Sequence, residues 1–430
     1  METFPVLSQS DAVKGRGFRM KKWRQSLLIL GLTAGMTGCG TTDSGPGSMA
    51  ISSGVDYGET DYELIADPNN ELGVKLLADL SETETGNIFI SPASLYMALA
   101  MLYNGADGVT QDEIAKVLEA EEITPEEMNR ANASLMMELR SESDKIQLNV
   151  ANSLWVKDNY QFEGAFIESS QDYYNAKIES IDVSDPASAD AINNWVSEAT
   201  NDKIEEMVPN PLPGNLVAIL LNAIYFKGEW QHPFEQEATQ LQPFKLTDGT
   251  SEQVPLMRLQ AELPYFETES FQAVSLPYGD GEMSMHVFLP NETSSLEEFV
   301  SGLDAAAWSE WMEEFHPQEG TLGFPKFELE YEVILNETLE HLGMATAFSS
   351  VDLSRMLEES SGLSISEVKQ KTYIKVNEEG TEAAAATSIA VEESAPADPF
   401  SMEVNRPFFF AITDRGTGVI LFMGAIKNPA

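Results

Sequence analysis

An almost unbroken apolar run, LVAILLNAIYF at residues 216–226, restricts the possible folds of this chain more than any other segment. The run has the length of a strand and follows PNPLPGN, a stretch of turn-forming residues, so it predicts a β-strand buried on both faces. At Ser91-Pro92 the sequence instead favours the start of a helix, with Ser as N-cap and Pro in the first helical position. Helical and strand patterns alternate irregularly, without an internal repeat. We therefore predict one large domain of mixed α and β structure over residues 61–430.

The start of the chain has the pattern of an export signal. A basic segment at 19–25, RMKKWRQ, precedes an apolar run at 27–36 that ends in small residues. This order is typical of a secretory signal peptide, and the run is shorter than the ~20 residues of a membrane-spanning helix. We expect residues 1–38 to be removed as a signal peptide. Met20 would make a compact start, which would leave 1–19 as a mis-assigned extension.

Cys39 ends the stretch Met36-Thr37-Gly38-Cys39, which resembles a bacterial lipobox apart from its first residue. The resemblance implies cleavage before Cys39 and lipidation of its thiol. The alternative is a plain signal peptide cut nearby, with Cys39 incidental; we favour the lipoprotein because this is the only Cys in the sequence. Gly, Ser and Thr are frequent in the residues that follow, so 39–60 are expected to form a flexible tether.

The chain is strongly acidic, with 25 Lys and Arg against 70 Asp and Glu and a formal net charge of −45. Without residues 1–38, the remaining 392 residues would carry −49. Such a surface repels phosphate groups, which excludes nucleic acid as a partner. One Cys excludes a disulfide framework, and the four scattered His (His232, His286, His316 and His341) show no metal-ligand spacing, so no metal or cofactor is expected. We predict an exported, water-soluble domain that is either held at the cell envelope by lipid or secreted.

The sequence contains no recognisable catalytic motif. It has no G-x-S-x-G elbow, no H-E-x-x-H and no Walker A motif. Its sole Cys lies in the export signal, and carboxylates are too numerous for a catalytic pair to stand out. His286 falls in an apolar strand pattern, as structural histidines do. We therefore predict that the protein is not an enzyme.

Residues 378–394, EEGTEAAAATSIAVEES, differ from the rest of the chain. Four consecutive Ala favour a helix, yet the segment also alternates as a strand does, with small uncharged residues such as Thr381, Ala383 and Ala385 on one face. It contains no Pro, so it could become a central strand whose small face slips between existing strands. The alternative, an acidic surface linker or short helix, is favoured when the segment is considered alone.

Four segments in a fixed order reverse that preference. They are NIFISPASLYMALAMLYNGA at 87–106, LLNAIYFKGEWQHPF at 220–234, VNEEGTEAAAAT at 376–387 and NRPFFFAITDRGTGVILFMGAIKNP at 405–429. These segments resemble the second helix, the central strand and breach, the loop hinge and the C-terminal signature of the serpin family, the serine protease inhibitors. The resemblance covers residues 68–430. It implies a serpin fold with three β-sheets, eight or nine helices and an exposed reactive-centre loop at about 378–405.

The resemblance also implies inhibition by a suicide-substrate mechanism. A target protease attacks the loop and forms an acyl-enzyme, after which the cleaved loop inserts as a new strand into the largest sheet and drags the protease with it. At ~3.3 Å per strand residue, about 15 inserted residues would move the protease by roughly 50 Å. Distortion of the protease active site would then block deacylation. Such a mechanism requires a metastable native fold.

By resemblance, the hinge residues have individual roles. Gly380 is the pivot at the base of the loop. Thr381 is the first inserted residue that faces inward, where a charge would stall insertion. The small-residue hinge continues through Glu382, Ala383, Ala384, Ala385 and Ala386.

Two further regions control how the sheet opens. The breach, where the sheet first opens, is assigned by resemblance to Glu378 and Trp230. The shutter beneath the sheet is assigned to Ser91, Ser94 and Asn222. At the position where the family often has a His in the shutter, this chain has Gln370, which could form similar hydrogen bonds but could not titrate.

The scissile bond is predicted at Ser394–Ala395 by counting forward from the hinge. Ser394 would enter the primary pocket of the protease, with Glu393 or Ala395 as the next candidates. Counting back from the C-terminal signature places the bond about two residues later. Pro396 and Pro399 disfavour that choice, because Pro resists both cleavage and strand insertion.

The composition of the loop limits the target protease. Residues 376–405 contain seven acids and no Lys or Arg, so a trypsin-like pocket has no basic side chain to bind. An elastase- or subtilisin-type protease fits better, and a glutamyl-specific protease could use Glu393. The expected partner is a serine protease, with a cysteine protease as a second option, in a covalent acyl complex with a monomeric inhibitor.

Two other classes of protein remain open at this point. One is a non-inhibitory serpin that acts as a binding or scaffold protein on the cell envelope. Thr381 and the Ala run argue against it, because a bulky or charged hinge is the usual departure in such members. The other is an unrelated acidic envelope lipoprotein or hydrolase, against which the four matching segments argue.

Overall fold

The computed structural model describes residues 46–140, 143–359, 364–382 and 399–430. The expected signal peptide, Cys39, the hinge alanines 383–386 and most of the reactive-centre loop lie outside the described residues. Among them are the three candidates for the reactive bond, Glu393, Ser394 and Ala395.

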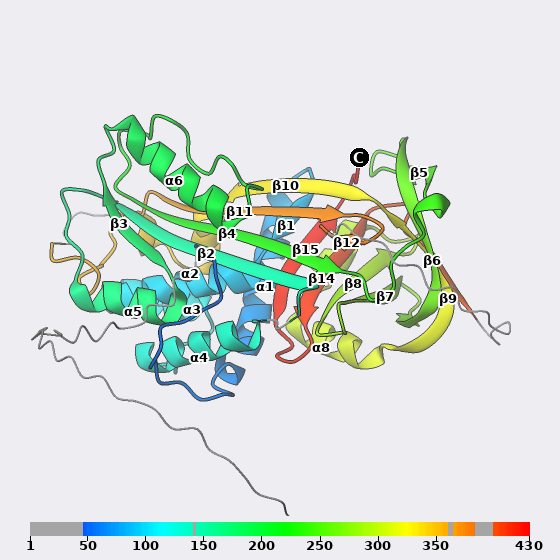
Figure 1. The fold of residues 1–430 in the computed structure, drawn as a ribbon, viewed down its shortest axis with the longest axis horizontal. Helices are drawn as coiled ribbons and strands as arrows, with labels where there is room; N and C mark the ends of the chain where they lie inside the picture. The colour runs from blue at the N-terminus through cyan, green and yellow to red at the C-terminus, as the bar shows by residue number, and fades with distance from the viewer. Residues whose placement is uncertain (1–45, 141–142, 360–363, 383–398) are drawn as a thin grey trace, which may run out of the picture. The chain divides into compact units, whose positions relative to one another are not determined.

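Nine α-helices and fifteen strands make up the described part of the chain (Figure 1). The helices are α1 (Glu63–Thr83), α2 (Pro92–Gly105), α3 (Gly108–Val117), α4 (Pro125–Glu138), α5 (Gly164–Tyr174), α6 (Pro186–Ala199), α7 (Leu296–Ser301), α8 (Ala305–Glu314) and α9 (Asn336–Leu342). The strands are β1 (Ile88–Ile90), β2 (Ile146–Lys157), β3 (Lys177–Ile181), β4 (Ala218–Glu229), β5 (Gln240–Lys245), β6 (Ser251–Glu267), β7 (Phe271–Tyr278), β8 (Met283–Pro290), β9 (His316–Pro325), β10 (Phe327–Ile334), β11 (Glu367–Val376), β12 (Gly380–Thr381), β13 (Phe400–Glu403), β14 (Phe408–Asp414) and β15 (Ile420–Ile426).

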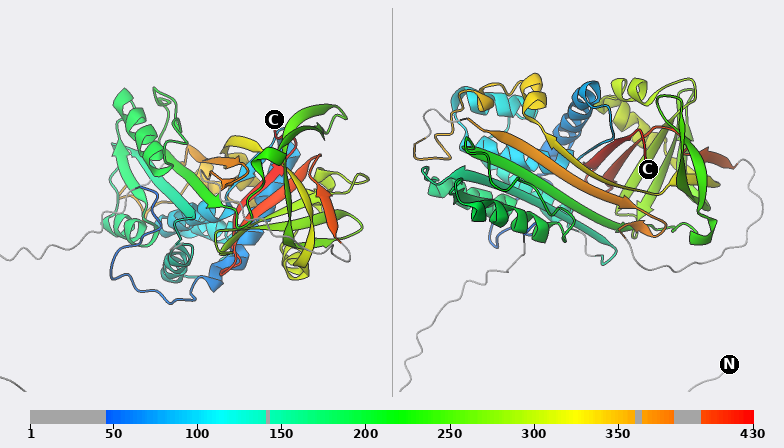
Figure 2. Two further views of the ribbon diagram at one scale, coloured as in Figure 1. Left: turned by 45° about the vertical axis from the view of Figure 1, so that its right-hand side comes forward. Right: turned by 90° about the horizontal axis from the view of Figure 1, so that it is seen from above.

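A six-stranded sheet carries the segments that matter for the hinge, in the order β10-β11-β12-β4-β2-β3. Strand β4 contains most of the apolar run predicted to be a strand, and its residues 218–226 are all buried, as expected for a strand covered on both faces. Helix α6 packs on one face through Ala189, Ile192 and Val196, while α2 lies against the other face (Figure 1). Strands β11 and β4 run parallel to each other (Figure 2).

A nine-stranded sheet holds the other strands, in the order β1-β15-β14-β8-β7-β6-β9-β13 with β5 paired to β6. Strand β6 has 17 residues and takes part in two sets of pairings. Its end, at 265–267, pairs with β7, whereas the rest of the strand pairs with β5 and β9. The sheet therefore has two portions joined through β6, and with the six-stranded sheet they account for the three predicted β-sheets. The predicted mixed α and β fold is confirmed, and the nine helices of the described residues agree with the expected eight or nine.

The chain already contacts the domain before α1 begins. Met49 is buried, and the Val150 N–H of β2 donates to the Gly47 carbonyl at 2.9 Å. The expected flexible tether over 39–60 therefore does not extend to Gly47 and Met49, because Gly47 is hydrogen-bonded to β2 and Met49 is buried.

Candidate functional site

The predicted loop hinge begins inside the six-stranded sheet. Gly380 and Thr381 form the short strand β12, which lies between the ends of β11 and β4 (Figure 1). Thr381 pairs with Val376 of β11 and with Gly228 of β4, and Gly380 pairs with Glu229. The first two hinge residues therefore already occupy the place of an additional strand.

The backbone at Gly380 approaches β4 too closely for any larger residue. Its φ is +154°, and a Cβ atom there would lie 2.1 Å from the carbonyl oxygen of Gly228 and 2.8 Å from the Cα of Glu229. Both distances are well below van der Waals contact, so glycine is required at this position of the hinge. The pivot role assigned to Gly380 thus has a steric reason.

Thr381 points into the protein interior. Its side chain is fully buried, and its hydroxyl is 2.7 Å from the hydroxyl of Tyr278 at the end of β7. The Tyr278 ring stacks on Trp230, with 4.4 Å between ring centroids. A charged side chain in place of Thr381 would have to be buried against this aromatic pair, which costs several kcal/mol unless the charge is paired.

A tight turn connects β11 to β12, and Trp230 holds it in place. The side-chain oxygen of Asn377 accepts hydrogen bonds from the N–H groups of Glu379 at 2.9 Å and Gly380 at 3.1 Å. The indole N–H of Trp230 donates to the Asn377 carbonyl at 3.0 Å, and its backbone N–H donates to the Glu379 carbonyl at 2.9 Å. Trp230 therefore fastens the turn where the predicted breach lies.

Glu378, the second predicted breach residue, is held in the same turn by an ion pair. Its carboxylate accepts hydrogen bonds from the Lys326 ammonium at 2.9 Å and from the Thr239 hydroxyl at 2.8 Å. Burial acts to raise the pKa of Glu378, but these two hydrogen bonds, a backbone hydrogen bond and the charge of Lys326 together outweigh it and hold the pKa below its ordinary value. The carboxylate is therefore charged at neutral pH and ties the turn to the segments that carry Thr239 and Lys326.

Buried polar side chains from α2, β2, β4 and β11 form one hydrogen-bonded network under the middle of the sheet. The Asn222 amide contacts the carbonyl and the hydroxyl of Ser94, and it donates to the side-chain oxygen of Asn152 at 2.6 Å. The Gln370 amide donates to Asn222 at 2.6 Å and to the Ser91 carbonyl at 2.9 Å. Its oxygen accepts the Ser91 N–H at 2.9 Å. These residues are at most 1% exposed. A polar group that loses its partner here could not form a replacement hydrogen bond with water.

The structure therefore brings the described hinge, breach and shutter residues together along β4 and β11, as parts of these strands or in contact with them. Some partners were not identified from the sequence: Tyr278, Thr239, Lys326 and Asn152. Asn152 follows the alternating apolar residues Ile146, Leu148 and Val150 and could have been noticed as an amide next to a strand-like pattern, but the other three carry no local signal. Their roles follow from strands that meet only in the folded protein.

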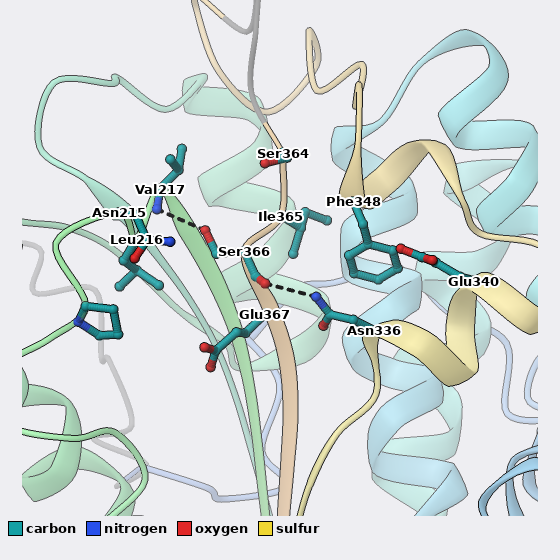
Figure 3. A pocket seen from close by; sticks show the side chains of 11 residues that line it. Asn215, Leu216, Val217, Asn336, Glu340, Phe348, Ser364, Ile365, Ser366 and Glu367 are labelled. Carbon is teal, nitrogen blue, oxygen red and sulfur yellow. Dashed lines mark hydrogen bonds between the residues drawn. The ribbon is translucent and has the colours of Figure 1, made fainter. Parts of the chain in front are cut away.

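A cavity of about 360 Å³ lies at the opposite end of β11 from the hinge (Figure 3). Ser366 holds its walls together: its hydroxyl accepts the Val217 N–H at 3.0 Å, and its carbonyl accepts the Asn336 side chain at 2.9 Å. The described lining residues include two serines and two glutamates but no His, Cys or Lys.

No metal site or membrane span is present in the described residues. Nowhere in 46–140, 143–359, 364–382 and 399–430 do three or more His, Cys, Asp or Glu side chains come together as metal ligands. Within the same ranges, the helices are too short or too polar to cross a membrane.

Comparison with known proteins identifies the family. A family model described as Serpin (serine protease inhibitor) matches residues 67–429. The chain belongs to the serpin family. Serpins are protease inhibitors and not catalysts, in agreement with the prediction that the chain is not an enzyme.

Several serpins are similar to this chain over nearly their whole length. Human serpin B4 is 33% identical over 388 residues, which cover 85% of this chain and 99% of serpin B4. The native structure of Tengpin, a thermophilic serpin, has a TM-score of 0.81 at 32% identity and covers 87% of this chain and 96% of its own. The structure of human thyroxine-binding globulin in complex with thyroxine has a TM-score of 0.80 at 26% identity. The match covers 86% of this chain and 100% of that chain. The solved structures similar to this chain thus include a protein whose name states thyroxine binding.

Proposed function

We propose that this serpin inhibits serine endopeptidases by trapping them as a covalent acyl complex. The observation that supports the proposal most is the position of Thr381, which is uncharged and already paired between β11 and β4. After Glu382 come four consecutive alanines, which are small enough to extend β12 between β11 and β4. A hinge of this kind favours insertion of the loop after cleavage.

The chemistry of trapping begins as ordinary proteolysis. The hydroxyl of the protease serine attacks the Ser394 carbonyl, the peptide bond to Ala395 breaks, and the proton passes to the new amine of Ala395. Ser394 is then joined to the protease as an ester. Inserted residues between Gly380 and Ser394 would carry that ester along the six-stranded sheet, by roughly 50 Å at ~3.3 Å per residue. A protease distorted by this movement cannot hydrolyse the ester.

Elastase- or subtilisin-type proteases are the proposed targets. No Lys or Arg occurs in 376–405, whereas the proposed bond joins two small residues, Ser394 and Ala395. Incubation of the protein with each protease class should give a complex that survives boiling in SDS. Mass spectrometry of the released C-terminal peptide should place the cleavage after Ser394, and the cleaved protein should have a higher melting temperature. If a broad panel of serine and cysteine proteases cuts the loop and no covalent complex forms, the inhibitory function is wrong.

A second candidate is a non-inhibitory serpin that binds other molecules at the cell envelope. The similarity to thyroxine-binding globulin favours it, because that relative shares the fold over 86% of this chain. The same assay separates the two functions: a binding protein would release cleaved loop and active protease, whereas an inhibitor would retain the protease.

We also propose that the protein is exported and held at the envelope through a lipid on Cys39. The short apolar run before Cys39 supports this location. Metabolic labelling with a radioactive fatty acid should label the processed wild-type protein and not a Cys39→Ser variant. Unlabelled protein that is released into the medium would instead support plain secretion.

A further inference from the structure

Glu382 ends the docked part of the hinge in a conformation that an inserted strand could not keep. Its φ is +63°, in the left-handed region, whereas a strand needs an extended backbone. Its N–H still donates to the Lys375 carbonyl of β11 at 3.0 Å, so the residue remains attached to the sheet. The chain therefore turns away from the sheet directly after Thr381.

The side chain of Glu382 is buried although it is a carboxylate. It is 4% exposed and forms an ion pair with Lys203, with 2.8 Å between Nζ and Oε1. The same carboxylate interacts with the hydroxyl groups of Tyr225 and Tyr373, which face each other across β4 and β11. Burial first, and then the nearby charge of Glu382, raise the pKa of Tyr225. A buried carboxylate of this kind depends on its cationic partner.

Lys203 belongs to the segment that follows α6, and that segment is itself fastened to β11. The ammonium group of Lys371 donates to the Glu206 carbonyl at 2.7 Å, and that of Lys369 donates to the Met207 carbonyl at 2.8 Å. Both lysine side chains are 8% exposed. Lys203 also lies over the Tyr373 ring, 5.5 Å from its centroid. The cation is therefore positioned at the seam between β4 and β11, where the loop must insert.

We propose that Lys203 is a positioning residue for loop insertion: by pairing with Glu382 it keeps the hinge docked, with two residues in the sheet, until the loop is cleaved. The kinetic part of this inference rests on the proposed inhibitory function, because it concerns the step after acylation. When the hinge is already docked, the first residues of the inserting strand are paired with the sheet before the cleaved loop moves. Without the pair, the hinge would leave the sheet, and insertion would have to begin again while the protease deacylates.

The first test measures docking in the resting protein, without any protease. In Lys203→Met the carboxylate of Glu382 is left buried and unpaired, so the peptide that spans the hinge should exchange its amide hydrogens at least threefold faster by mass spectrometry. Lys203→Arg keeps the charge and should restore slow exchange. Lys177→Met is the matched control, because Lys177 also pairs with a glutamate, Glu179, and lies over a ring, Trp155, but on β3.

The double variant Lys203→Met/Glu382→Gln tests whether the two residues act as a pair. Removal of the carboxylate takes away the unpaired charge, so this variant should exchange more slowly than Lys203→Met. Equal exchange in the wild type and Lys203→Met, or equal acceleration in the Lys177→Met control, would overturn the docking role.

The second test measures how many inhibitor molecules are consumed for each protease trapped. This ratio should rise at least twofold in Lys203→Met and return to the wild-type value in Lys203→Arg. Faster exchange with an unchanged ratio would overturn the role in insertion. If the wild type traps no protease, the proposed inhibitory function fails, while the exchange measurement still decides whether Lys203 docks the hinge.

Discussion

Gln370 of β11 donates a hydrogen bond of 2.6 Å to Asn222 of β4, its direct partner in the parallel register of the two strands. The bond joins the two strands that would have to separate in the proposed insertion of the loop, and it lies within the predicted shutter. Both partners are neutral amides. The centre of the sheet is thus held closed by groups whose charge does not change with pH.

Replacement of Gln370 by His should therefore introduce a pH dependence at the shutter. An imidazole titrates near pH 6.5, and its protonation would place a charge in a buried network of neutral groups. We expect the denaturant midpoint of Gln370→His to fall more steeply than that of the wild type between pH 8 and pH 5.5. If the denaturant midpoints of the two proteins change equally with pH, this position does not control opening of the sheet.

Removal of the central amide of the network should destabilise the native fold. Asn222→Ala leaves Gln370 and Asn152 without a shared partner in a buried site, and each unsatisfied group costs about 1–3 kcal/mol. We expect a loss of about 3 kcal/mol in the free energy of unfolding, measured by urea denaturation. Asn149→Ala on neighbouring β2 removes one part-buried hydrogen bond, to the Ala199 carbonyl, and should cost at most about half as much. Equal losses in the two variants would contradict a special role for Asn222.

A charge at the first inserted position should convert the inhibitor into a substrate. Thr381→Arg would bury a guanidinium against Tyr278 and Trp230, which the site cannot pair. We expect at least a tenfold smaller yield of covalent complex on SDS gels, with the loop still cleaved. Ser251→Arg provides the control, because it introduces the same charge on an exposed residue of β6, outside the reactive-centre loop, and should leave the yield unchanged. A normal yield from Thr381→Arg would mean that insertion does not pass through this position.

His286 should make the domain less stable in acid. Its ring is buried in β8, 2.9 Å from the Thr413 hydroxyl, and burial lowers its pKa to about 4. The native fold thus favours the neutral ring, so this contribution to stability is complete above the ordinary pKa of about 6.5 and is lost as the pH falls towards 4. The difference between the two pKa values corresponds to about 3 kcal/mol.

Urea unfolding at pH 7 and pH 4.5 measures this contribution. His286→Gln should lose less stability than the wild type over that interval, whereas His341→Gln, on the exposed end of α9, should not show the same protection. If His286→Gln and the wild type lose equal stability, the acid sensitivity lies in other groups.

Much of the fold could be predicted because its signals are local. The apolar run of β4 and the Ser91-Pro92 start of α2 depend on neighbouring residues, and both elements form where the sequence places them. The burial of Met49 and the hydrogen bond between Gly47 and β2 could not be predicted, because the composition of 39–60 indicates only flexibility and does not show which surface the segment can reach.

By itself, the sequence determined the composition of the hinge: a glycine pivot, an uncharged Thr381 and a run of small residues without Pro. Only the tertiary structure decided how far the hinge is docked and what holds it there. Tyr278 is 103 positions from Thr381, and Lys203 meets Glu382 only because the segment after α6 crosses the seam between β4 and β11. Such contacts depend on strand register and on the packing of distant elements, and these arise from the energy of the whole fold and not from any local pattern.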